Sequence, residues 1–338
     1  MYFCKMNIHF SIVVPVYNRP DETRELLESI AAQTYDQTFE VVIVEDGSQI
    51  TSEAEVAKFQ SQLDIHYLCK SNSGPGDSRN YGMRLAKGSY FIILDSDCIL
   101  PEHYLESVAS FLDKNFVHCF GGPDAALDSF STIQKAINYS MTSFFTTGGI
   151  RGSKKSVNKF QPRSFNMGIS KEAFLATGGY GKIHPGEDPD LTIRLWETGY
   201  ETALIEDAFV YHKRRISWEK FYKQVNKFGQ TRPILNNRYP YTAKITYWFP
   251  ALFCIGFVVA LSLLFFGQVA GILLYASYFI VIIMHSAREN KSWKVGLMTL
   301  IAVCIQFFGY GYGFLRSTLV LRLVKKSPEE LFPHLFFK

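Results

Sequence analysis

The chain has 338 residues, of which 47% are apolar and 20% are charged, and its formal net charge is +4. This length allows one large or two ordinary domains with a substantial core. The six cysteines form no C-x-x-C pair, so a reduced, cytosol-facing chain without a structural zinc is expected. The apolar stretch at the N-terminus is short, ends in Pro15 and has no small-residue cleavage site. It therefore predicts a first strand and not a signal peptide.

Strand and helix signals then alternate in the way that builds a parallel sheet. Strands are predicted at 10–16, 40–45, 65–69 and 90–94, and helices at 21–32, 52–63 and 76–87. A further strand is predicted at 165–170. The pattern is typical of a nucleotide-binding α/β half-domain, but a fold class alone does not give a function.

The run YFIILDSDCIL is a continuous apolar strand that ends in Asp95 and Asp97. A buried parallel strand delivers these carboxylates to its carboxyl end, where open α/β sheets bind ligands. Alternation along the strand turns both to the same side, so both can face one hard cation that carries phosphate oxygens. The sequence thus predicts a metal and diphosphate site here, although short polar runs after strands are usually turns.

A second candidate for phosphate binding is NSGPGDSRNYG. Its glycines, with Gly76 among them, allow the backbone to approach a ligand, and the amides at the start of the helix favour anions. Arg79, on the first turn of this helix, adds a permanent fork of hydrogen-bond donors. A surface ion pair is the other interpretation of Arg79.

The C-terminal third is strongly apolar. Segments 247–266 and 269–284 carry no charge, and the first is about 20 residues long, enough for a helix to cross a hydrocarbon layer of about 30 Å. A third segment, 295–315, contains Gln306 and the run GYGYG. Lysines and arginines flank the region, and by the positive-inside rule the first two segments form a hairpin that enters from the cytoplasm. The third is then expected to be re-entrant or interfacial. A buried helical domain is the alternative.

Two further segments lie before this tail. ISWEKFYKQVNKFGQ has aromatic residues at helical spacing with lysines between them, which suits an amphipathic helix on an anionic bilayer; packing against the sheet is the alternative. Residues 148–163 are rich in glycine and lysine and are predicted to form a mobile loop; a disordered surface excursion is the alternative.

Five motifs, taken together and in order, resemble a family 2 glycosyltransferase. They are SIVVPVYNRP, FEVVIVEDGS, NSGPGDSRNYGMRLAKGSYFIILDSDC, FNMGISKEAFLATGGY and GEDPDLTIRLWETGY. The resemblance covers roughly residues 10 to 235. It implies a GT-A fold, which is an α/β fold with a Rossmann-like, mostly parallel central sheet. Domain 1–235 is then the catalytic domain, and 236–338 is a C-terminal region of transmembrane or membrane-associated helices, as in membrane-anchored bacterial members.

The resemblance also implies roles for particular residues. Asp97 would contact Mn2+ or Mg2+ directly, Asp95 would touch ribose or the metal through water, and His212 would be a third metal ligand or a phosphate donor. The remaining residues implied to bind the nucleotide-sugar are Pro15, Tyr17, Asn18, Asp46, Gly76, Arg79, Arg215, Gln224 and Arg232. Glu45 is left as a neighbour of Asp46.

On the acceptor side the resemblance implies an acidic pair. A hydroxyl that attacks a sugar needs a base to take its proton, and Asp188 would be that base, with Glu187 positioning a sugar. Asp190 is expected to cap the helix that runs to Thr198. Asn166 and Gly168 would line the acceptor side. One base without a carboxylate nucleophile implies a single displacement with inversion.

The predicted function is metal-dependent transfer of a sugar from a nucleoside diphosphate sugar, with a UDP-sugar favoured, to a hydroxyl of a lipid-linked or cell-envelope saccharide. The expected partners are therefore donor, acceptor and membrane lipid, without nucleic acid. The expected location is a bacterial inner membrane, with several spans and a cytoplasmic catalytic domain. The alternatives are a sugar-phosphate nucleotidyltransferase and a non-catalytic membrane scaffold that binds a nucleotide-sugar.

Overall fold

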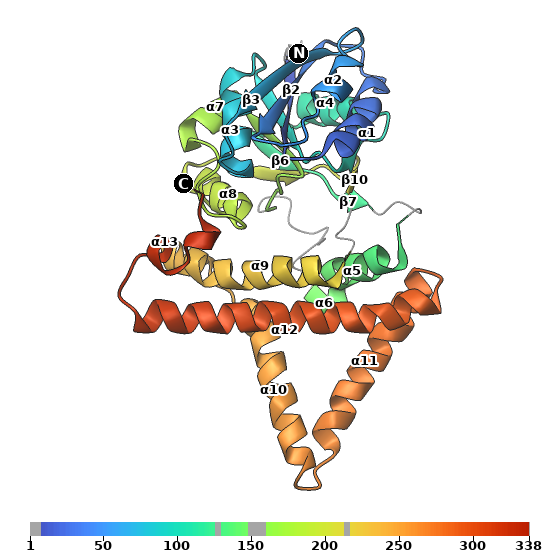
Figure 1. The fold of residues 1–338 in the computed structure, drawn as a ribbon, viewed down its shortest axis with the longest axis vertical. Coiled ribbons are helices and arrows are strands. Elements are labelled where there is room, and N and C mark those ends of the chain that lie inside the picture. Colours follow the sequence, from blue (N-terminus) through green and yellow to red (C-terminus); the bar gives the residue numbers. More distant parts are fainter. Residues whose placement is uncertain (1–7, 126–129, 148–159, 213–216, 338) are drawn as a thin grey trace. The chain divides into compact units, whose positions relative to one another are not determined.

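The structure, a computed structural model, describes residues 8–125, 130–147, 160–212 and 217–337 (Figure 1). These residues form two compact units. Unit 1 takes in the described residues of 1–125, 154–212 and 337–338, and unit 2 takes in those of 126–153 and 213–336. The predicted loop at 148–163 lies largely outside the described residues.

Unit 1 is built on a central sheet with the strand order β3-β2-β1-β4-β8-β6-β9. The strands are β1 (Phe10–Val16), β2 (Phe39–Asp46), β3 (Asp64–Lys70), β4 (Tyr90–Leu94), β6 (Cys119–Gly121), β8 (Asn166–Ser170) and β9 (Thr202–Leu204). β3, β2, β1 and β4 are parallel, β8 is antiparallel to both β4 and β6, and β9 is parallel to β6. The predicted mostly parallel sheet is therefore confirmed.

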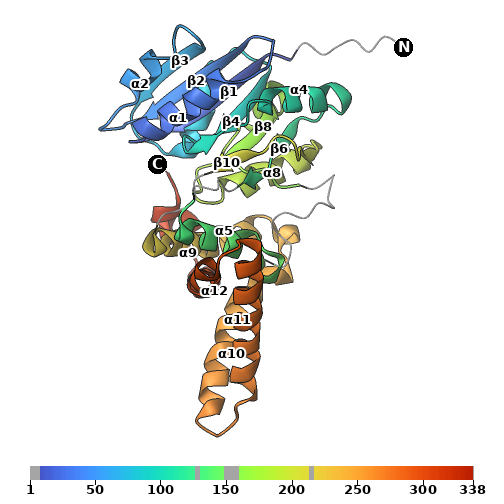
Figure 2. The same ribbon diagram turned by 90° about the vertical axis from the view of Figure 1, so that its right-hand side faces the viewer.

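Helices cover both faces of this sheet because successive side chains of each strand point to opposite sides. On β1, Ile12 and Val14 pack with α1 (Pro20–Ala31), α2 (Glu53–Ala57) and α4 (Tyr104–Lys114). Val13, between them, packs with α3 (Pro75–Leu85), α7 (Lys171–Thr177) and α8 (Glu187–Glu197). Figure 1 shows the sheet between these two layers, and Figure 2 shows it from the side of α1 and α2. The order reverses between β1 and β4, and the carboxyl ends at such a switch point are where open sheets bind ligands.

A small second sheet extends the D-x-D region. β5 (Cys98–Ile99) follows Asp97 directly and pairs antiparallel with β10 (Val210–His212), which also pairs in parallel with β7 (Asp124–Ala125). The register sets His212 opposite Cys98. This sheet brings a residue from late in the chain to the end of β4.

The predicted strands and helices of unit 1 are confirmed with small shifts. β1 and β4 have the predicted bounds, and the other strands and two of the helices differ by one or two residues. The helix predicted at 52–63 is wrong in length, because α2 ends at Ala57 and turns follow it.

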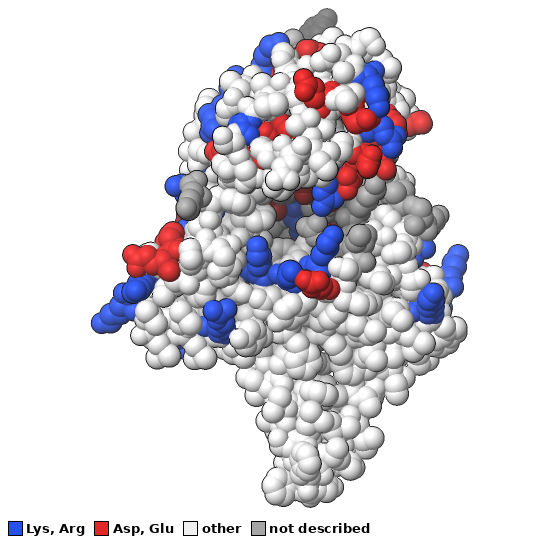
Figure 3. All heavy atoms as spheres, viewed as in Figure 1, with Lys and Arg blue, Asp and Glu red and all other residues white. Residues whose placement is uncertain are grey.

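Unit 2 consists of helices. They are α5 (Thr132–Thr142), α6 (Phe144–Thr147), α9 (Trp218–Arg238), α10 (Phe249–Leu264), α11 (Ala270–Glu289), α12 (Trp293–Leu323) and α13 (Pro328–Leu331), with 3-10 turns at Pro240–Thr242, Ile245–Trp248 and Pro333–Leu335. α10 and α11 form a hairpin, and α12 runs across its open end beside α9 (Figure 1). Figure 3 shows no lysine, arginine, aspartate or glutamate over the half of the hairpin nearest its turn on the face in view.

Three helices are long and apolar enough to cross a membrane: Ile245–Leu264, Ala270–Glu289 and Trp293–Leu323. In the most apolar 18-residue stretch of each helix, 17% is buried inside the protein for the first two helices and 44% for the third. The third therefore has a larger share of protein contacts, which agrees with the expectation that it differs from the hairpin.

Glycines of the GYGYG run let α12 pack closely on its neighbours. A Cβ on Gly313 would lie 2.4 Å from the carbonyl oxygen of Asn226 in α9, and one on Gly311 would lie 3.0 Å from that of Pro250 in α10. Phe221 and Val225 of α9 are buried in a cluster with α5 and α12. The apolar face of α9 is thus used in packing within unit 2. The division into compact units falls at residue 212, before α9, and the predicted end of the catalytic domain at residue 235 stays a prediction.

Candidate active site

The turns that follow β1 and β2 are joined through Asn18. Its side-chain oxygen accepts hydrogen bonds from the backbone N–H groups of Gln49 (2.8 Å) and Ile50 (3.0 Å), and its own N–H donates to Ser48 Oγ at 2.7 Å. Asn18 has φ +53°, a conformation that asparagine tolerates better than most residues. Pro15 closes β1, and Tyr17, predicted to touch the nucleotide, is 51% exposed. These contacts hold the predicted nucleobase loop in place.

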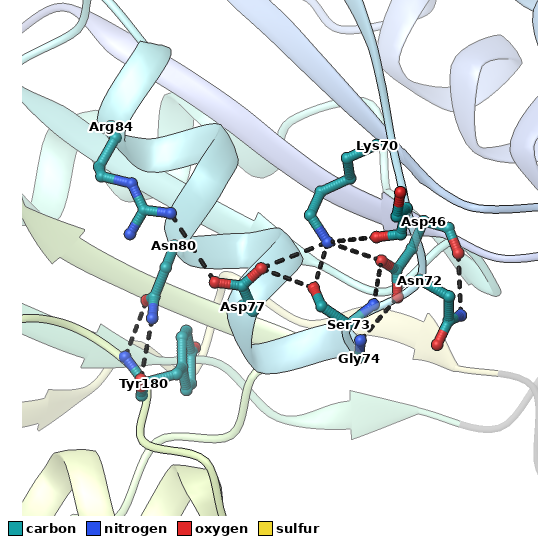
Figure 4. A network of polar contacts seen from close by, with 10 residues as sticks. Asp46, Lys70, Asn72, Ser73, Gly74, Asp77, Asn80, Arg84 and Tyr180 are labelled. Atoms are coloured by element: carbon teal, nitrogen blue, oxygen red, sulfur yellow. Dashed lines mark hydrogen bonds and ion pairs between the residues drawn. The ribbon is translucent and has the colours of Figure 1, made fainter. Parts of the chain in front are cut away.

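Asp46, at the end of β2, is 3% exposed and both its oxygens accept hydrogen bonds (Figure 4). Lys70 Nζ (2.8 Å) and the Ser73 N–H (3.0 Å) donate to Oδ1, and the Gly74 N–H (2.9 Å) donates to Oδ2. The carboxylate therefore organises the loop between β3 and α3. Contact with a nucleobase stays a prediction.

Glu45 has a structural role next to Asp46. Its carboxylate accepts hydrogen bonds from the Ser52 N–H at 2.9 Å, from Tyr67 OH at 2.8 Å and from Ser48 Oγ, and the residue is 2% exposed. It holds the turn between β2 and α2, so the expectation that Glu45 is only a neighbour of the site agrees with its contacts.

Arg79 connects the two predicted acidic clusters. From α3, its Nη2 donates to Asp95 Oδ1 at 2.7 Å, and its Nη1 lies 3.5 Å from Glu187 Oε1. The guanidinium is 5.3 Å from the ring centre of Tyr180, and the residue is 3% exposed. Burial lowers the pKa of Arg79, but the upward effect of the surrounding acids is larger, so the net shift of the pKa is upward. Its Nε and Nη1 atoms are buried and make no hydrogen bond, which leaves donors available for an anionic ligand.

The acidic pair begins α8, beside Arg79. Glu187 is 5% exposed; burial raises its pKa, but His184, at 2.8 Å, and Arg79 outweigh burial, so the pKa lies below its usual range. Burial and the neighbouring Glu187 raise the pKa of Asp188 to about 6, against the opposing effect of Arg79. Asp188 Oδ1 is buried without a hydrogen-bond partner. One carboxylate is thus held ionised, while the next is poised to exchange a proton near neutral pH.

Asn80 positions this pair relative to α3. Its amide donates to the carbonyl oxygen of Tyr180 at 2.8 Å and accepts from the Tyr180 N–H at 2.8 Å (Figure 4). A Cβ on Gly76, one turn earlier, would lie 3.3 Å from Cβ of Tyr180. The segment that leads to Glu187 is therefore fastened to the helix that carries Arg79. Asn80 and His184 were not predicted, because their partners lie far away in sequence or depend on a turn.

Asp97 and His212 come together through the pairing of β5 with β10. His212 Nε2 lies 3.2 Å from Asp97 Oδ1, and the His212 ring stacks on Phe165 with centres 4.7 Å apart. Adjacent ligands of a six-coordinate ion with bonds of about 2.1 Å are about 3 Å apart, so this pair fits Mg2+ or Mn2+. Cys98 lies within the same cluster, but burial and nearby acids raise the pKa of its thiol well above the usual range. The oxygen of Asp97 and the nitrogen of His212 suit a hard ion better than this sulfur does.

The predicted acceptor residues Asn166 and Gly168 lie inside the sheet. Asn166 is 0% exposed, and its amide accepts from Tyr104 OH (2.6 Å) and donates to the carbonyl oxygen of Ala208 (2.8 Å). A Cβ on Gly168 would lie 1.9 Å from the ring of Phe120. Neither residue faces solvent in this structure, so the direct acceptor contact that the resemblance implied has no surface here. Their contacts serve packing.

The remaining predicted residues lie elsewhere. Arg215 is outside the described residues, and Gln224 and Arg232 belong to α9 in unit 2. Arg232 donates to Asn236 Oδ1 at 3.0 Å and lies 4.4 Å from the ring centre of Tyr247. Asp190, expected to cap α8, instead pairs with Arg194 at 3.0 Å, and Gly186 occupies the cap position.

Comparisons with known proteins give one family. Residues 11–174 match the family model described as Glycosyl transferase family 2. TarS of Staphylococcus aureus, a poly(ribitol-phosphate) beta-N-acetylglucosaminyltransferase, is 35% identical over 109 residues, which are 31% of this chain and 19% of TarS. GgaB of Bacillus subtilis, a minor teichoic acid biosynthesis protein, is 33% identical over 213 residues, which are 62% of this chain and 23% of GgaB. The chain thus spans less than a quarter of either relative.

A solved structure shares the fold. The mannosyltransferase PcManGT from Pyrobaculum calidifontis, in complex with GDP-Man and Mn2+, superimposes with a TM-score of 0.60 at 17% identity, over 89% of this chain and 87% of that one. At this level of identity the likeness concerns the fold alone.

Proposed function

Since residues 11–174 match the model of glycosyl transferase family 2 and the chain has the GT-A fold, we propose that it transfers a sugar from a nucleoside diphosphate donor to a hydroxyl of a cell-envelope saccharide. The proposed reaction is a single displacement at the anomeric carbon with inversion. The proposed substrates are a UDP-sugar and a lipid-linked or polymeric saccharide acceptor.

The main support is the contact set of Arg79. One buried guanidinium touches Asp95 of the D-x-D run and Glu187 of the acidic pair. The two constellations, far apart in sequence, therefore form one site at the carboxyl ends of β1 and β4. A transferase needs the leaving diphosphate and the attacking hydroxyl on either side of one sugar, which this arrangement allows.

The chain's own residues supply three actions. Arg79 offers two buried donors that are not hydrogen-bonded to the described protein, so it can bind the diphosphate when Asp95 turns to the ribose or the metal. Asp188, with a pKa of about 6, accepts the acceptor's hydroxyl proton. Glu187, held by His184 and Arg79, orients a sugar hydroxyl. A divalent metal held by Asp97 and His212, with Asp95 beside them, would stabilise the charge of the leaving diphosphate.

The nature of the substrates rests on the relatives. The name of TarS specifies transfer of N-acetylglucosamine to poly(ribitol phosphate), and GgaB is named for teichoic acid biosynthesis. Both names point to a phosphate-containing or saccharide polymer of the cell envelope, and a UDP-sugar is the donor we favour. PcManGT was solved with GDP-Man, so GDP-sugars belong in any test.

The membrane part of the proposal rests on the hairpin α10–α11. Phe265 and Phe266 at its turn are 91% and 79% exposed, and no charged residue lies between Lys244 and Arg288. Exposed apolar surface of this extent marks a contact with lipid or protein, and the length of both helices fits a membrane. In this proposal both ends of the hairpin lie on the cytoplasmic side, because basic residues flank them.

The test is nucleotide release by the full chain in detergent. The donors are UDP-, GDP- and dTDP-sugars, each with Mn2+, Mg2+ or EDTA, and each with and without a bacterial lipid extract. We expect release from one donor that needs metal and increases with the extract, and that is lost in Asp97→Ala and Asp188→Asn. Pyrophosphate release from a nucleoside triphosphate would instead identify a nucleotidyltransferase, and donor binding without release under all conditions would favour the scaffold.

A further inference from the structure

A second cluster of potential metal ligands lies at the amino ends of β2 and β3. It consists of Glu40, Asp64 and His66, whose ligand atoms all lie within 4.8 Å of one another. The parallel register sets Glu40 opposite Asp64 and Val42 opposite His66. Since alternate residues of a strand share a face, Asp64 and His66 point to the same side of β3.

Glu40 is a buried carboxylate with one oxygen left for a ligand. It is 1% exposed, and its Oε1 accepts from Ser11 Oγ (2.6 Å) and from the N–H groups of Lys87 (2.5 Å) and Gly88 (3.1 Å). Burial raises the pKa of Glu40, but these donors outweigh it and the net shift is downward, so the group is ionised. Its Oε2 is buried and has no hydrogen-bond partner. A buried anionic oxygen without a hydrogen bond is costly, and a bound cation would offset this cost.

The spacing of the cluster matches a tetrahedral ion. His66 Nε2 lies 3.4 Å from Glu40 Oε2 and 3.4 Å from Asp64 Oδ1. Four-coordinate zinc has bonds of about 2.0 to 2.2 Å to nitrogen and oxygen, which places neighbouring ligands about 3.4 Å apart. A separation of 3.4 Å is longer than an ordinary N–H···O hydrogen bond. The geometry therefore fits ligands around a shared ion better than a direct hydrogen bond.

A cation already lies close to this position. Lys87 Nζ is 3.1 Å from His66 Nε2. An ammonium group can only donate, so His66 must turn a lone pair toward it. The same lone pair is what a metal ion requires. Lys87 is an exposed residue on a flexible stem and can leave the cluster without disturbing the sheet.

We propose that Glu40, Asp64 and His66 bind one divalent transition-metal ion of the Zn2+ class, in place of the Lys87 ammonium, with water as the fourth ligand. The ion would tie the amino ends of β2 and β3 to the turn between α3 and β4, because Glu40 also binds the backbone of that turn. The cysteine pattern gave no sign of this site, since none of its ligands is a cysteine.

This site is separate from the proposed catalytic metal. Glu40 and Asp46 are at opposite ends of β2, and six residues of strand span about 20 Å. The proposal also does not depend on the proposed function, since it rests on residues that take no part in sugar transfer.

The test is equilibrium dialysis of the full chain in detergent against Zn2+ after treatment with EDTA, with metal measured per chain. Asp97→Ala serves as the background, so that the catalytic site does not contribute. We expect one tightly bound Zn2+ per chain in this background, and its loss on adding His66→Asn or Asp64→Asn. Both positions are at the surface, with His66 35% and Asp64 63% exposed, so both variants should fold. Circular dichroism in EDTA checks this.

Two further variants make the test specific. His103→Asn is the matched control, because His103 also lies beside a carboxylate, Glu106 at 3.0 Å, but is not in this cluster; it should keep the ion. Lys87→Ala removes the competing charge and should tighten Zn2+ binding by about tenfold. Zinc binding unchanged by His66→Asn, or lost equally in His103→Asn, would overturn the proposal. An unchanged affinity in Lys87→Ala would overturn the exchange of ammonium for metal.

Discussion

Replacing Asp188 with asparagine should affect the catalytic rate and the stability of the fold in opposite directions. Asparagine has nearly the same shape, but it cannot take a proton and carries no charge. Asp188 lies at the start of α8 next to Glu187, and its Oδ1 is buried without a hydrogen-bond partner. The wild-type protein therefore keeps a costly buried charge whose benefit, in this account, is catalytic.

The effect on stability follows from the pKa. Burial and Glu187 raise the pKa of Asp188 from 3.8 to about 6, against Arg79. A raised pKa means that the folded protein holds this proton more tightly than the unfolded chain, so the contribution favours folding at low pH and is lost as the pH rises toward 6. A shift of about two units corresponds to about 3 kcal/mol. Asp188→Asn does not titrate, so its stability relative to wild type should rise by about this amount between pH 4 and pH 7.5.

The same substitution, which should raise the relative stability at pH 7.5, should lower the activity. Loss of a general base lowers kcat by about 10²- to 10⁴-fold, while the donor's KM should change little. In the wild type, kcat/KM for the acceptor should decrease as the pH is lowered through about 6, because protonated Asp188 cannot accept the hydroxyl proton. The assays are initial rates of nucleotide release and denaturant unfolding at pH 4, 5, 6 and 7.5.

Asp190→Asn is the matched control, two residues along the same helix. Asp190 pairs with Arg194, so its loss should destabilise the protein at pH 7.5 and leave kcat within a few-fold of wild type. A variant Asp188→Asn that keeps more than a tenth of kcat would refute the assignment of the base. If the difference in stability between Asp188→Asn and wild type does not change with pH, the raised pKa of Asp188 would be refuted.

Three other perturbations test separate parts of the account. Arg79→Met leaves the buried Glu187 and the partly exposed Asp95 without their partner and should cost about 3–5 kcal/mol in the free energy of unfolding; thermal melts at pH 7.5 measure this, and an unchanged melting temperature would count against the ion-pair network. His212→Ala should raise the Mn2+ concentration for half-maximal activity at least tenfold, and an unchanged metal titration would remove it from the ligands. Gly168→Ala forces a Cβ to within 1.9 Å of Phe120 and should cost about 1–3 kcal/mol by denaturant unfolding, a cost whose absence would mean that the ring moves freely.

Strands β1, β2 and β4 could be predicted from the sequence because each contains a short run of buried apolar residues. All five residues of β4 are buried, and β1 is nearly so. The predicted helix at 52–63 was too long because Val56 is the only residue of α2 that is buried. Without more apolar contacts, helical propensity does not hold the following residues in a helix.

The extent of α12 could not be predicted from hydropathy. The apolar segment ends at Leu315, but the helix continues to Leu323 through Arg316 and Ser317. Ser317 is fully buried, so packing within unit 2 continues the helix where hydropathy no longer favours a span. The glycines that permit this packing were visible as GYGYG, but their partners on α9 and α10 were not.

The candidate site was predictable where residues sit in local motifs. Asp95, Asp97, Arg79 and the acidic pair were each visible at the end of a strand or the start of a helix. Their assembly depends on long-range contacts, such as the bond between Asn80 and Tyr180, which are 100 residues apart. Motif resemblance also assigned a ligand contact to Asn166, which the structure uses to bind Tyr104 and Ala208 inside the core.

The central claim is that the two acidic constellations together transfer a sugar. Its most direct test is the appearance of labelled sugar in the acceptor: full-length protein is incubated with the radiolabelled donor, metal and bacterial membranes, and the label is measured in the lipid-extractable and polymer fractions. The account predicts label in one of these fractions with wild type and Asp190→Asn, and initial rates of incorporation lower by about a hundredfold or more with Asp188→Asn and Asp97→Ala. Label incorporated equally by wild type and Asp188→Asn would contradict it.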